Sequence, residues 1–368
     1  MRFPEFSGEW KMCTIGELTT KVGSGVTPRG GEAVYKTEGH PFVRSQNVGL
    51  GNLLLDDIAF IDEETHLRQK NTELQFNDVL LNITGASIGR SALVDKQIVG
   101  GNVNQHVCII RTKENLVPSF ICSFLLSNYG QRQIDSFQAG GNRQGLNFEQ
   151  IKSIKITIPS KDEQIKIAKL LRAIDERIAT QNKIIEKLQS LIKGIAQNVA
   201  RNNKPNIRLS ECLECSSSTL QESDVCKNGT YPVYGANGIV GYLDNYNTEK
   251  EAVYIIKDGS GVGTVSYVTG KCSATGTLNT LQAKEGYSLQ YLYYMLKVFN
   301  FEPYKTSMAI PHIYFKDYGK AKIFCPSYTE QLKYARLLSA IDNKLSAEQS
   351  ILTDLSLQKQ YLLRQMFI

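Results

Sequence analysis

The sequence predicts a mixed α/β protein in which two globular domains are separated and joined by two long helices, which pair as an antiparallel coiled coil with pseudo-two-fold organisation. Three observations predict this fold: a segment that recurs in the second half of the chain, a heptad pattern of apolar residues after each copy, and matched strand and glycine patterns in the regions between. We expect a globular domain at 1–158, a helix at 159–200, a second globular domain at 201–325 and a second helix at 326–368. A chain of 368 residues exceeds one ordinary hydrophobic core, which agrees with this division.

The recurring segment is Pro159–Ile178, which returns 167 residues later as Pro326–Leu345 with eleven of twenty positions identical. Each copy begins with Pro-Ser, and Ser160 and Ser327 each stand three residues before a glutamate, which is the spacing of a helix capping box. The repeat therefore indicates an internal duplication and two helices that begin in the same way.

Apolar residues follow each helix start at alternating spacings of three and four, a pattern typical of helices that pair with each other. A helix of about 40 residues is about 60 Å long at 1.5 Å per residue, which is too long for one globular core. Gln181 and Glu348 share one repeat position inside the seam, where a polar group fixes register, and Lys359 stands where the first copy has Ile192. The alternative is two amphipathic helices that each pack on their own domain. The residues predicted to pair the helices are Leu171, Ile174, Ile178, Ile185, Leu188, Ile192, Leu338, Ile341, Leu345, Leu352, Leu355 and Leu362.

Composition limits the class of protein. No run of eighteen apolar residues occurs and the N-terminus lacks the basic-then-apolar order of a signal peptide, so we expect a cytoplasmic protein with eight reduced cysteines. Cys212 and Cys215 have a CxxC spacing, but no second such pair or paired histidines follow, so we expect buried thiols and no metal site. The net charge of +6 has no basic tail, so any nucleic acid would be bound by locally arranged lysines and arginines.

The two globular regions carry matched strand and loop patterns. Asp78–Ile83 and Ala252–Ile256 are apolar runs typical of strands, and Gly85–Gly89 and Gly259–Gly263 follow them as the same loop in two domains. The loops lack the GxxxxGK[ST] pattern of a P-loop and the GxGxxG pattern of a dinucleotide site, which favours tight turns between strands over nucleotide binding. Four scattered histidines and no recognisable nucleophile motif predict no active site.

Three features together resemble the specificity subunit of type I restriction-modification systems: the opening Arg2–Trp10, the helix start Pro-Ser-x-x-Glu-Gln used twice, and the segment Tyr231–Gly238. The likeness spans nearly the whole chain, and the alternation of two different domains with two near-identical helices is highly specific. The resemblance implies two target-recognition domains, each reading one half of a split double-stranded DNA sequence, with helices that set the half-site spacing and dock two methyltransferase subunits. It also implies restriction and translocase subunits as partners, and it places S-adenosylmethionine and ATP on the partners and no cofactor on this chain.

We expect the chain itself to be non-catalytic, because no Asn/Asp-Pro-Pro-Tyr methyltransferase motif and no Walker motif occurs in it. Two alternatives stay open. The chain could be a coiled-coil scaffold whose globular ends bind protein, or a polypeptide with fused catalysis, although no part of the 368 residues is left over to hold a catalytic domain.

Candidate DNA-binding residues are the polar loop residues that can pair with base edges, such as arginine with guanine and asparagine or glutamine with adenine. For each one, a solvated loop side chain or a turn-forming side chain is the alternative. The candidates of the first domain are Arg44, Ser45, Asn47, Thr84, Ser87, Arg90, Asn102, Asn104, Gln105, Arg143 and Gln144. The candidates of the second domain are Tyr234, Asn237, Lys257, Ser260, Thr264, Lys271, Thr275, Asn279, Lys305 and His312.

Overall fold

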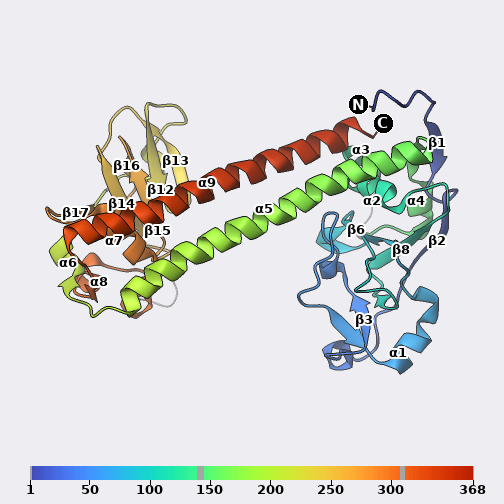
Figure 1. Cartoon of the computed structure of the whole chain (residues 1–368), viewed down its shortest axis with the longest axis horizontal. Coiled ribbons are helices and arrows are strands. Elements are labelled where there is room, and N and C mark those ends of the chain that lie inside the picture. The colour runs from blue at the N-terminus through green and yellow to red at the C-terminus, as the bar shows by residue number, and fades with distance from the viewer. Residues whose placement is uncertain (1, 139–144, 307–310, 368) are drawn as a thin grey trace. The chain divides into compact units, whose positions relative to one another are not determined.

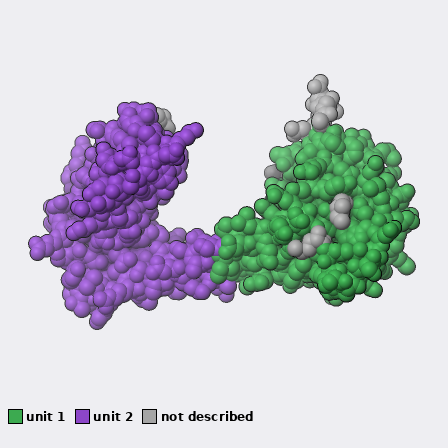
Figure 2. Space-filling view, turned by 90° about the horizontal axis from the view of Figure 1, so that it is seen from above, with its two compact units in different colours: residues 1–181, 351–368 green, residues 182–350 purple. Residues whose placement is uncertain are grey.

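The computed structural model describes residues 2–138, 145–306 and 311–367. The candidates Arg143 and Gln144 lie outside the described residues. The chain forms two compact units, unit 1 with residues 1–181 and 351–368, and unit 2 with residues 182–350 (Figures 1 and 2). Among the described residues, no helix has the length and apolar character needed to cross a membrane.

Unit 1 contains two main sheets, a two-stranded ribbon and short helices. Its elements are β1 (Lys11–Thr14), β2 (Thr19–Ser24), η1 (Gly31–Val34), β3 (His40–Val43), η2 (Ser45–Asn47), β4 (Ala59–Ile61), α1 (Glu63–Arg68), η3 (Lys70–Thr72), β5 (Val79–Asn82), η4 (Gly85–Ser87), β6 (Ser91–Leu93), β7 (Asn102–Val103), β8 (Val107–Thr112), α2 (Pro118–Leu126), α3 (Asn128–Ser136), α4 (Phe148–Ser153) and β9 (Lys155–Ile158). The sheets run in the orders β2-β8-β5-β6 and β4-β3-β7, and β1 pairs with β9. Only the β3–β7 pair is parallel among these described strands.

Unit 2 repeats this topology strand for strand. Its elements are β10 (Ile207–Arg208), α6 (Leu209–Cys212), β11 (Leu213–Ser217), η5 (Glu222–Asp224), β12 (Tyr231–Gly235), β13 (Gly238–Leu243), β14 (Glu251–Ile256), β15 (Val265–Thr269), β16 (Ser273–Ala274), β17 (Leu278–Ala283), α7 (Leu289–Lys297), η6 (Glu302–Tyr304), α8 (Phe315–Tyr318) and β18 (Lys322–Ile323). The sheets run β11-β17-β14-β15 and β13-β12-β16, with β12 parallel to β16, and β10 pairs with β18. The mixed α/β fold and its duplication are therefore confirmed.

Two long helices complete the units, α5 (Lys161–Arg201) and α9 (Tyr328–Gln365). Each contributes one part to unit 1 and another to unit 2. In unit 1 the early residues Leu171 and Ile174 of α5 share a hydrophobic core with the late residue Leu362 of α9. In unit 2 the late part of α5 and the early part of α9 line one pocket. Within each unit the two helices therefore pack in opposite directions, as the seam predicts.

The glutamine of the repeated Pro-Ser-x-x-Glu-Gln segment has the same buried role in both units. Gln164 accepts a hydrogen bond from the backbone N–H of Val117 at 2.9 Å, and its amide donates to two backbone carbonyls. Gln331 accepts from the backbone N–H of Ser288 at 2.9 Å and also donates to a carbonyl. Each glutamine ties the start of a long helix to the residue just before α2 or α7, because a buried backbone N–H needs an acceptor.

The glutamate of the same segment differs between the units. The Ser160 hydroxyl accepts from the Glu163 backbone N–H at 3.4 Å, while the fully buried Glu163 carboxylate accepts two hydrogen bonds from Arg2 at 2.8 Å. The Glu330 carboxylate instead accepts from the Ser327 backbone N–H at 3.3 Å and the Ser327 hydroxyl at 2.7 Å. Both serines are thus at helix starts as predicted, but only the first glutamate holds the N-terminal segment on its unit.

A buried ion pair distinguishes the four-stranded sheet of unit 1 from that of unit 2. Asp78 is 1% exposed and its carboxylate accepts two hydrogen bonds from Arg111, at 2.7 Å each. The registers of the β5·β8 and β14·β17 pairs place Ala252 and Gln282 at the corresponding positions of unit 2. The same strand pairing is therefore stabilised by different chemistry in the two units.

The three-stranded sheets of the two units differ most in the length of one connection between strands. Residues 44–58 connect β3 to β4 in unit 1, whereas residues 236–237 suffice between β12 and β13 in unit 2. The long connection reaches α9, where the Leu50 carbonyl accepts a hydrogen bond from Lys359 Nζ at 3.3 Å. Lys359 also pairs with Asp175 of α5 at 2.6 Å. The lysine that departs from the apolar seam therefore anchors a segment of its own unit.

Candidate nucleic-acid interface

The two glycine loops have one conformation. Gly85 and Gly89 have φ of +73° and +84°, and Gly259 and Gly263 have φ of +95° and +90°, a backbone region that glycine adopts without strain. Each loop closes with a hydrogen bond back to the preceding strand, from Gly89 N–H to the Asn82 carbonyl at 3.0 Å and from Gly263 N–H to the carbonyl at the end of β14 at 2.9 Å. These loops are therefore equivalent tight turns that present different side chains.

In each unit an imidazole lies beside the residue that precedes the first glycine of the loop. The Thr84 hydroxyl and His106 Nδ1 are 2.5 Å apart, and Asp258 Oδ1 and His312 Nδ1 are 2.6 Å apart. Backbone pairing of Thr84 with Gly145 and of Asp258 with His312 shows that residues 84 and 258 are equivalent. The two histidines come from different segments of the fold, because His106 directly precedes β8 and His312 lies between η6 and α8. The two units therefore place an imidazole at this position with residues that are not equivalent. Sequence reasoning missed His106 and Asp258, which only the alignment of the two loops could have indicated.

Six candidates are exposed and can reach a ligand directly. Arg90 and Thr264 are equivalent, because each accepts through its carbonyl from the last residue of the preceding strand, at 2.9 Å and 3.0 Å. One loop therefore ends with a cation and the other with a hydroxyl. The exposed candidates are Arg90, Gln105, Asn237, Ser260, Thr264 and Lys271.

Eight candidates are half-buried and several already have partners. The Arg44 guanidinium donates to the Asp57 carbonyl at 2.8 Å and lies 5.3 Å from the centre of the Tyr35 ring. Lys305 pairs with Glu302 at 2.6 Å. These contacts hold the two cations in defined orientations. The half-buried candidates are Arg44, Ser45, Thr84, Ser87, Tyr234, Lys257, Lys305 and His312.

Five candidates are buried. Asn47 donates to the Leu54 carbonyl at 2.9 Å, and Asn102 accepts from His66 Nδ1 at 2.7 Å. Asn279 donates to the Tyr318 hydroxyl at 3.0 Å. Side chains placed in this way support the loops, and they could meet a base only if the loops rearranged. The buried candidates are Asn47, Asn102, Asn104, Thr275 and Asn279.

An exposed cation stands over an aromatic pair in unit 2. Lys271 Nζ lies 4.8 Å from the centre of the Tyr246 ring and 6.0 Å from that of Tyr231, and the two rings are 5.1 Å apart. Hydrogen bonding to Tyr246 raises the pKa of Lys271, so the ammonium form is favoured at neutral pH. Sequence reasoning found the lysine but not the aromatic pair, which the start of β12 and the segment between β13 and β14 bring together.

The CxxC pair consists of buried or half-buried thiols. Burial raises the pKa of Cys212 to about 12 and that of Cys215 to about 11. Within the described ranges, no group of three or more histidine, cysteine, aspartate and glutamate side chains could hold a metal ion.

The exposed and half-buried candidates together offer hydrogen-bond donors, hydrogen-bond acceptors and cations. Proteins recognise base edges and phosphates with these groups.

Comparison with known proteins found a family match over most of the chain. A family model described as the type I restriction modification DNA specificity domain matches residues 7–190 and 205–356. A putative type I specificity subunit of Mycoplasma genitalium is 24% identical over 315 residues, covering 79% of this chain and 81% of that protein. The EcoKI specificity subunit of Escherichia coli is 23% identical over 202 residues, covering 52% of this chain and 41% of that protein.

Solved structures show the same fold. The crystal structure of the S subunit of a type I restriction-modification system from M. genitalium superposes with a TM-score of 0.69 at 19% identity, covering 100% of this chain and 97% of that one. A chain from a structural study of complex assembly and conformational transition in the type I system superposes with a TM-score of 0.57 at 16% identity, covering 98% and 97%.

Proposed function

The chain belongs to the family of type I restriction-modification DNA specificity subunits, and we propose that its two units read the two halves of one split DNA target. Sequence-specific DNA recognition in a type I system is the role that the family match and the curated relatives support. The observation that carries the two-part reading is the strand-for-strand duplication of the fold with loops of different side chains. Two copies of one scaffold can present two independent sets of base contacts.

The readers in this proposal are the paired loops and the segments beside them. An arginine such as Arg90 can donate two hydrogen bonds to guanine in the major groove, whereas Thr264 at the equivalent position favours other contacts. The histidines beside Thr84 and Asp258 add donors or acceptors of fixed orientation. Different half-sites are then recognised without any change of scaffold.

The long helices in this proposal set the spacing between half-sites and dock two methyltransferase subunits. A helix of about 40 residues spans about 60 Å, and DNA turns once per about 34 Å, so a rigid pair would select one separation of the half-sites. The apolar seam inside each unit supports rigid pairing. Modification and restriction subunits are the partners that this arrangement would serve.

Catalysis in this proposal belongs to the partners. The chain carries neither a methyltransferase motif nor a Walker motif, so methyl transfer from S-adenosylmethionine and ATP-driven translocation are assigned to other subunits. The purified chain should transfer no labelled methyl group to DNA by itself.

The test is to express the chain with the methyltransferase subunit of its own system and to sequence the methylated bases of the host DNA. We expect one motif of two defined parts separated by a fixed unspecified gap, and no such methylation when the chain is omitted. A single uninterrupted motif would refute the two-part reading. Methylation at the same sites without the chain would refute the specificity role and favour a scaffold.

A further inference from the structure

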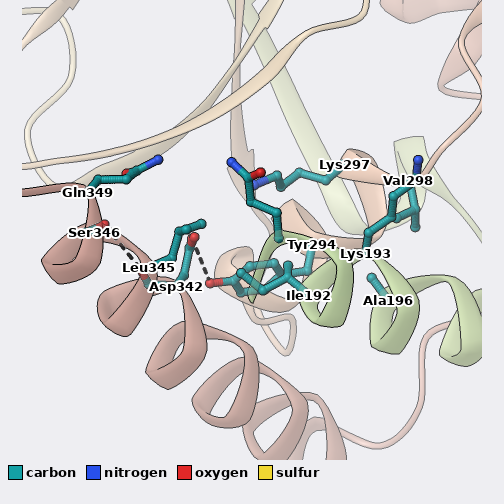
Figure 3. Close-up of a pocket in the computed structure, with 11 residues that line it drawn as sticks. Ile192, Lys193, Ala196, Tyr294, Lys297, Val298, Asp342, Leu345, Ser346 and Gln349 are labelled. Carbon is teal, nitrogen blue, oxygen red and sulfur yellow. Dashed lines mark hydrogen bonds between the residues drawn. The ribbon is translucent and has the colours of Figure 1, made fainter. Parts of the chain in front are cut away.

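Unit 2 has a pocket of about 430 Å³ where α7 meets the long helices α5 and α9 (Figure 3). Its floor is aliphatic and its rim is polar. A cavity of this size holds a few side chains. The lining residues on α5 are Gln189, Ile192, Lys193 and Ala196, those on or next to α7 are Tyr294, Lys297 and Val298, and those on α9 are Asp342, Leu345, Ser346 and Gln349.

The internal repeat shows how unit 1 fills the corresponding place. Lys359, equivalent to Ile192, reaches across to Asp175 at 2.6 Å and donates to the Leu50 carbonyl at 3.3 Å. A Cβ on Gly51 would lie 3.5 Å from Asp175 Oδ2 and 3.6 Å from Lys359 Nζ, so the main chain itself is seated against the helices. Unit 1 therefore occupies the site with residues 44–58 of its own chain.

Unit 2 has neither a lysine at the position of Lys359 nor a long connection like residues 44–58. Ile192 and Ala196 stand where the repeat has Lys359 and Leu363, so the side chains are shorter or uncharged. The connection that could reach the helices is reduced to residues 236–237. The pocket thus lies at the place in unit 2 that corresponds to the one unit 1 fills with its own chain.

The polar groups of the pocket select the chemistry of an occupant. The Asp342 carboxylate already accepts a hydrogen bond from the Tyr294 hydroxyl at 3.2 Å, and burial raises the pKa of that tyrosine, so the phenol remains a donor. Lys193 and Lys297 are exposed cations on the rim. Two ammonium groups above an aliphatic floor complement a carboxylate carried beside an apolar side chain.

A second pocket of about 440 Å³ in unit 1 is not the counterpart of this one. It is lined by α5 and α9 alone, with Ala173, Thr180 and Ile351 among its residues. It does not involve α2, the equivalent of α7. The two pockets therefore lie at different places in their units.

We propose that the pocket of unit 2 receives a turn of a methyltransferase subunit that carries an aliphatic side chain and a carboxylate, whereas residues 44–58 fill the corresponding place in unit 1. This inference rests on the proposed docking of two methyltransferase subunits and adds that the two dock differently. One subunit inserts a turn beside α7, and the other meets a surface already closed by residues 44–58.

The test gives unit 2 the residues of unit 1. In the variant Ile192→Lys with Ala196→Leu, a lysine can pair with Asp342 as Lys359 does with Asp175, and the leucine fills the floor. The probe is the methyltransferase subunit of the same system, with stoichiometry from native mass spectrometry and affinities from calorimetry. We expect the full chain to bind two copies, and the variant to bind one of them at least about tenfold more weakly while the other is unchanged.

Two further variants keep the test decisive. Lys193→Glu with Lys297→Glu changes only exposed side chains, so it should fold normally and weaken the same copy. Lys359→Ile with Leu363→Ala, the reciprocal exchange in unit 1, should leave the affinity of that copy unchanged. Wild-type binding of both copies by the first two variants would overturn the inference while the proposed function stands. Failure of the unaltered chain to bind any methyltransferase subunit would instead count against the proposed function.

Discussion

Unit 1 and unit 2 have equivalent strand orders, but they differ in one connection between strands and in several side chains on the shared scaffold. Both keep a buried glutamine at the start of the long helix and the same glycine conformation in the loop after the central strand. They differ in the connection inside the three-stranded sheet, in the buried ion pair and in the side chains of the loops. Duplication has therefore preserved the contacts at the start of each long helix and the conformation of the glycine loop, whereas one connection and the loop side chains have diverged.

That contrast shows which parts can be exchanged. A scaffold fixed by backbone pairing and two glutamines tolerates different loops, because the loops contribute little to the shared core. Features found in one unit alone, such as the pair of Asp78 with Arg111, are local solutions to packing. The following predictions test this division, beginning with the largest expected effect.

Exchange of a whole domain should have the largest effect. Replacing residues 14–158 by the corresponding domain of another family member should change one half of the methylated motif completely and leave the other half unaltered. Methylated-base sequencing of cells carrying the hybrid measures this. If both halves changed together, the units would not read independently.

Lengthening both helices should change the spacing rather than the sequence read. One heptad inserted after Leu188 and one after Leu355 keeps the apolar seam in register and adds about 10 Å at 1.5 Å per residue. With a rise of about 3.4 Å per base pair, the gap between half-sites should grow by up to about three base pairs, or binding should fail. Selection from a library of spacers measures the preferred gap. An active complex with the original gap would show that the helices do not set the distance, and a two-residue insertion, which turns the seam outward, serves as the disrupted control.

Removing the ion pair of unit 1 should cost stability in that unit alone. Asp78→Ala leaves Arg111 without its buried partner and should lower the free energy of unfolding by about 3 kcal/mol. The double variant Asp78→Ala with Arg111→Gln copies the residues of unit 2, Ala252 and Gln282, and should recover most of the loss because no charge is left uncompensated. Urea denaturation of the three proteins measures both effects. Equal loss in the single and double variants would mean that the pair itself stabilises the sheet.

Substitution of the repeated glutamine should have the smallest effect on stability, and the effect should be similar in the two units. Gln164→Ala and Gln331→Ala each leave a buried backbone N–H without its acceptor, which should lower stability by about 1–3 kcal/mol in the unit concerned. Hydrogen exchange at the Val117 and Ser288 amides, compared with thermal melting, assigns each loss to its unit. Losses confined to one variant would show that the repeated residue has diverged in role.

The fold was largely predictable because its signals are periodic. The heptad seam and the repeated helix start indicate two long helices, and the seam residues Leu171, Leu338 and Leu355 are buried. The sequence showed that Lys359 departs from the apolar pattern, but it did not show which groups the lysine contacts. Its partner Leu50 lies 309 residues away in sequence, and only the folded chain brings the two together.

The site was less predictable, because residue type does not reveal burial. Asn47 and Asn237 both lie near glycines in polar segments, yet the first is fully buried and the second exposed. The difference arises because Asn47 is held by the long connection of unit 1, whereas Asn237 forms the tip of a two-residue turn. Asp258 was overlooked for a similar reason, since its role depends on a histidine 54 positions away.

The composition of unit 1 from both ends of the chain also imposes an order on biosynthesis. Leu362, Met366 and Phe367 belong to the core formed by α2 and the first turns of α5, and the Phe367 ring lies 5.2 Å from that of Phe120. During translation these residues leave the ribosome after the whole of unit 2, which is contiguous in the chain and can close first. The domain made first is therefore completed last. A nascent chain that stops before residue 362 would keep unit 1 open to chaperones and proteases, so only near-complete chains would accumulate with both readers folded.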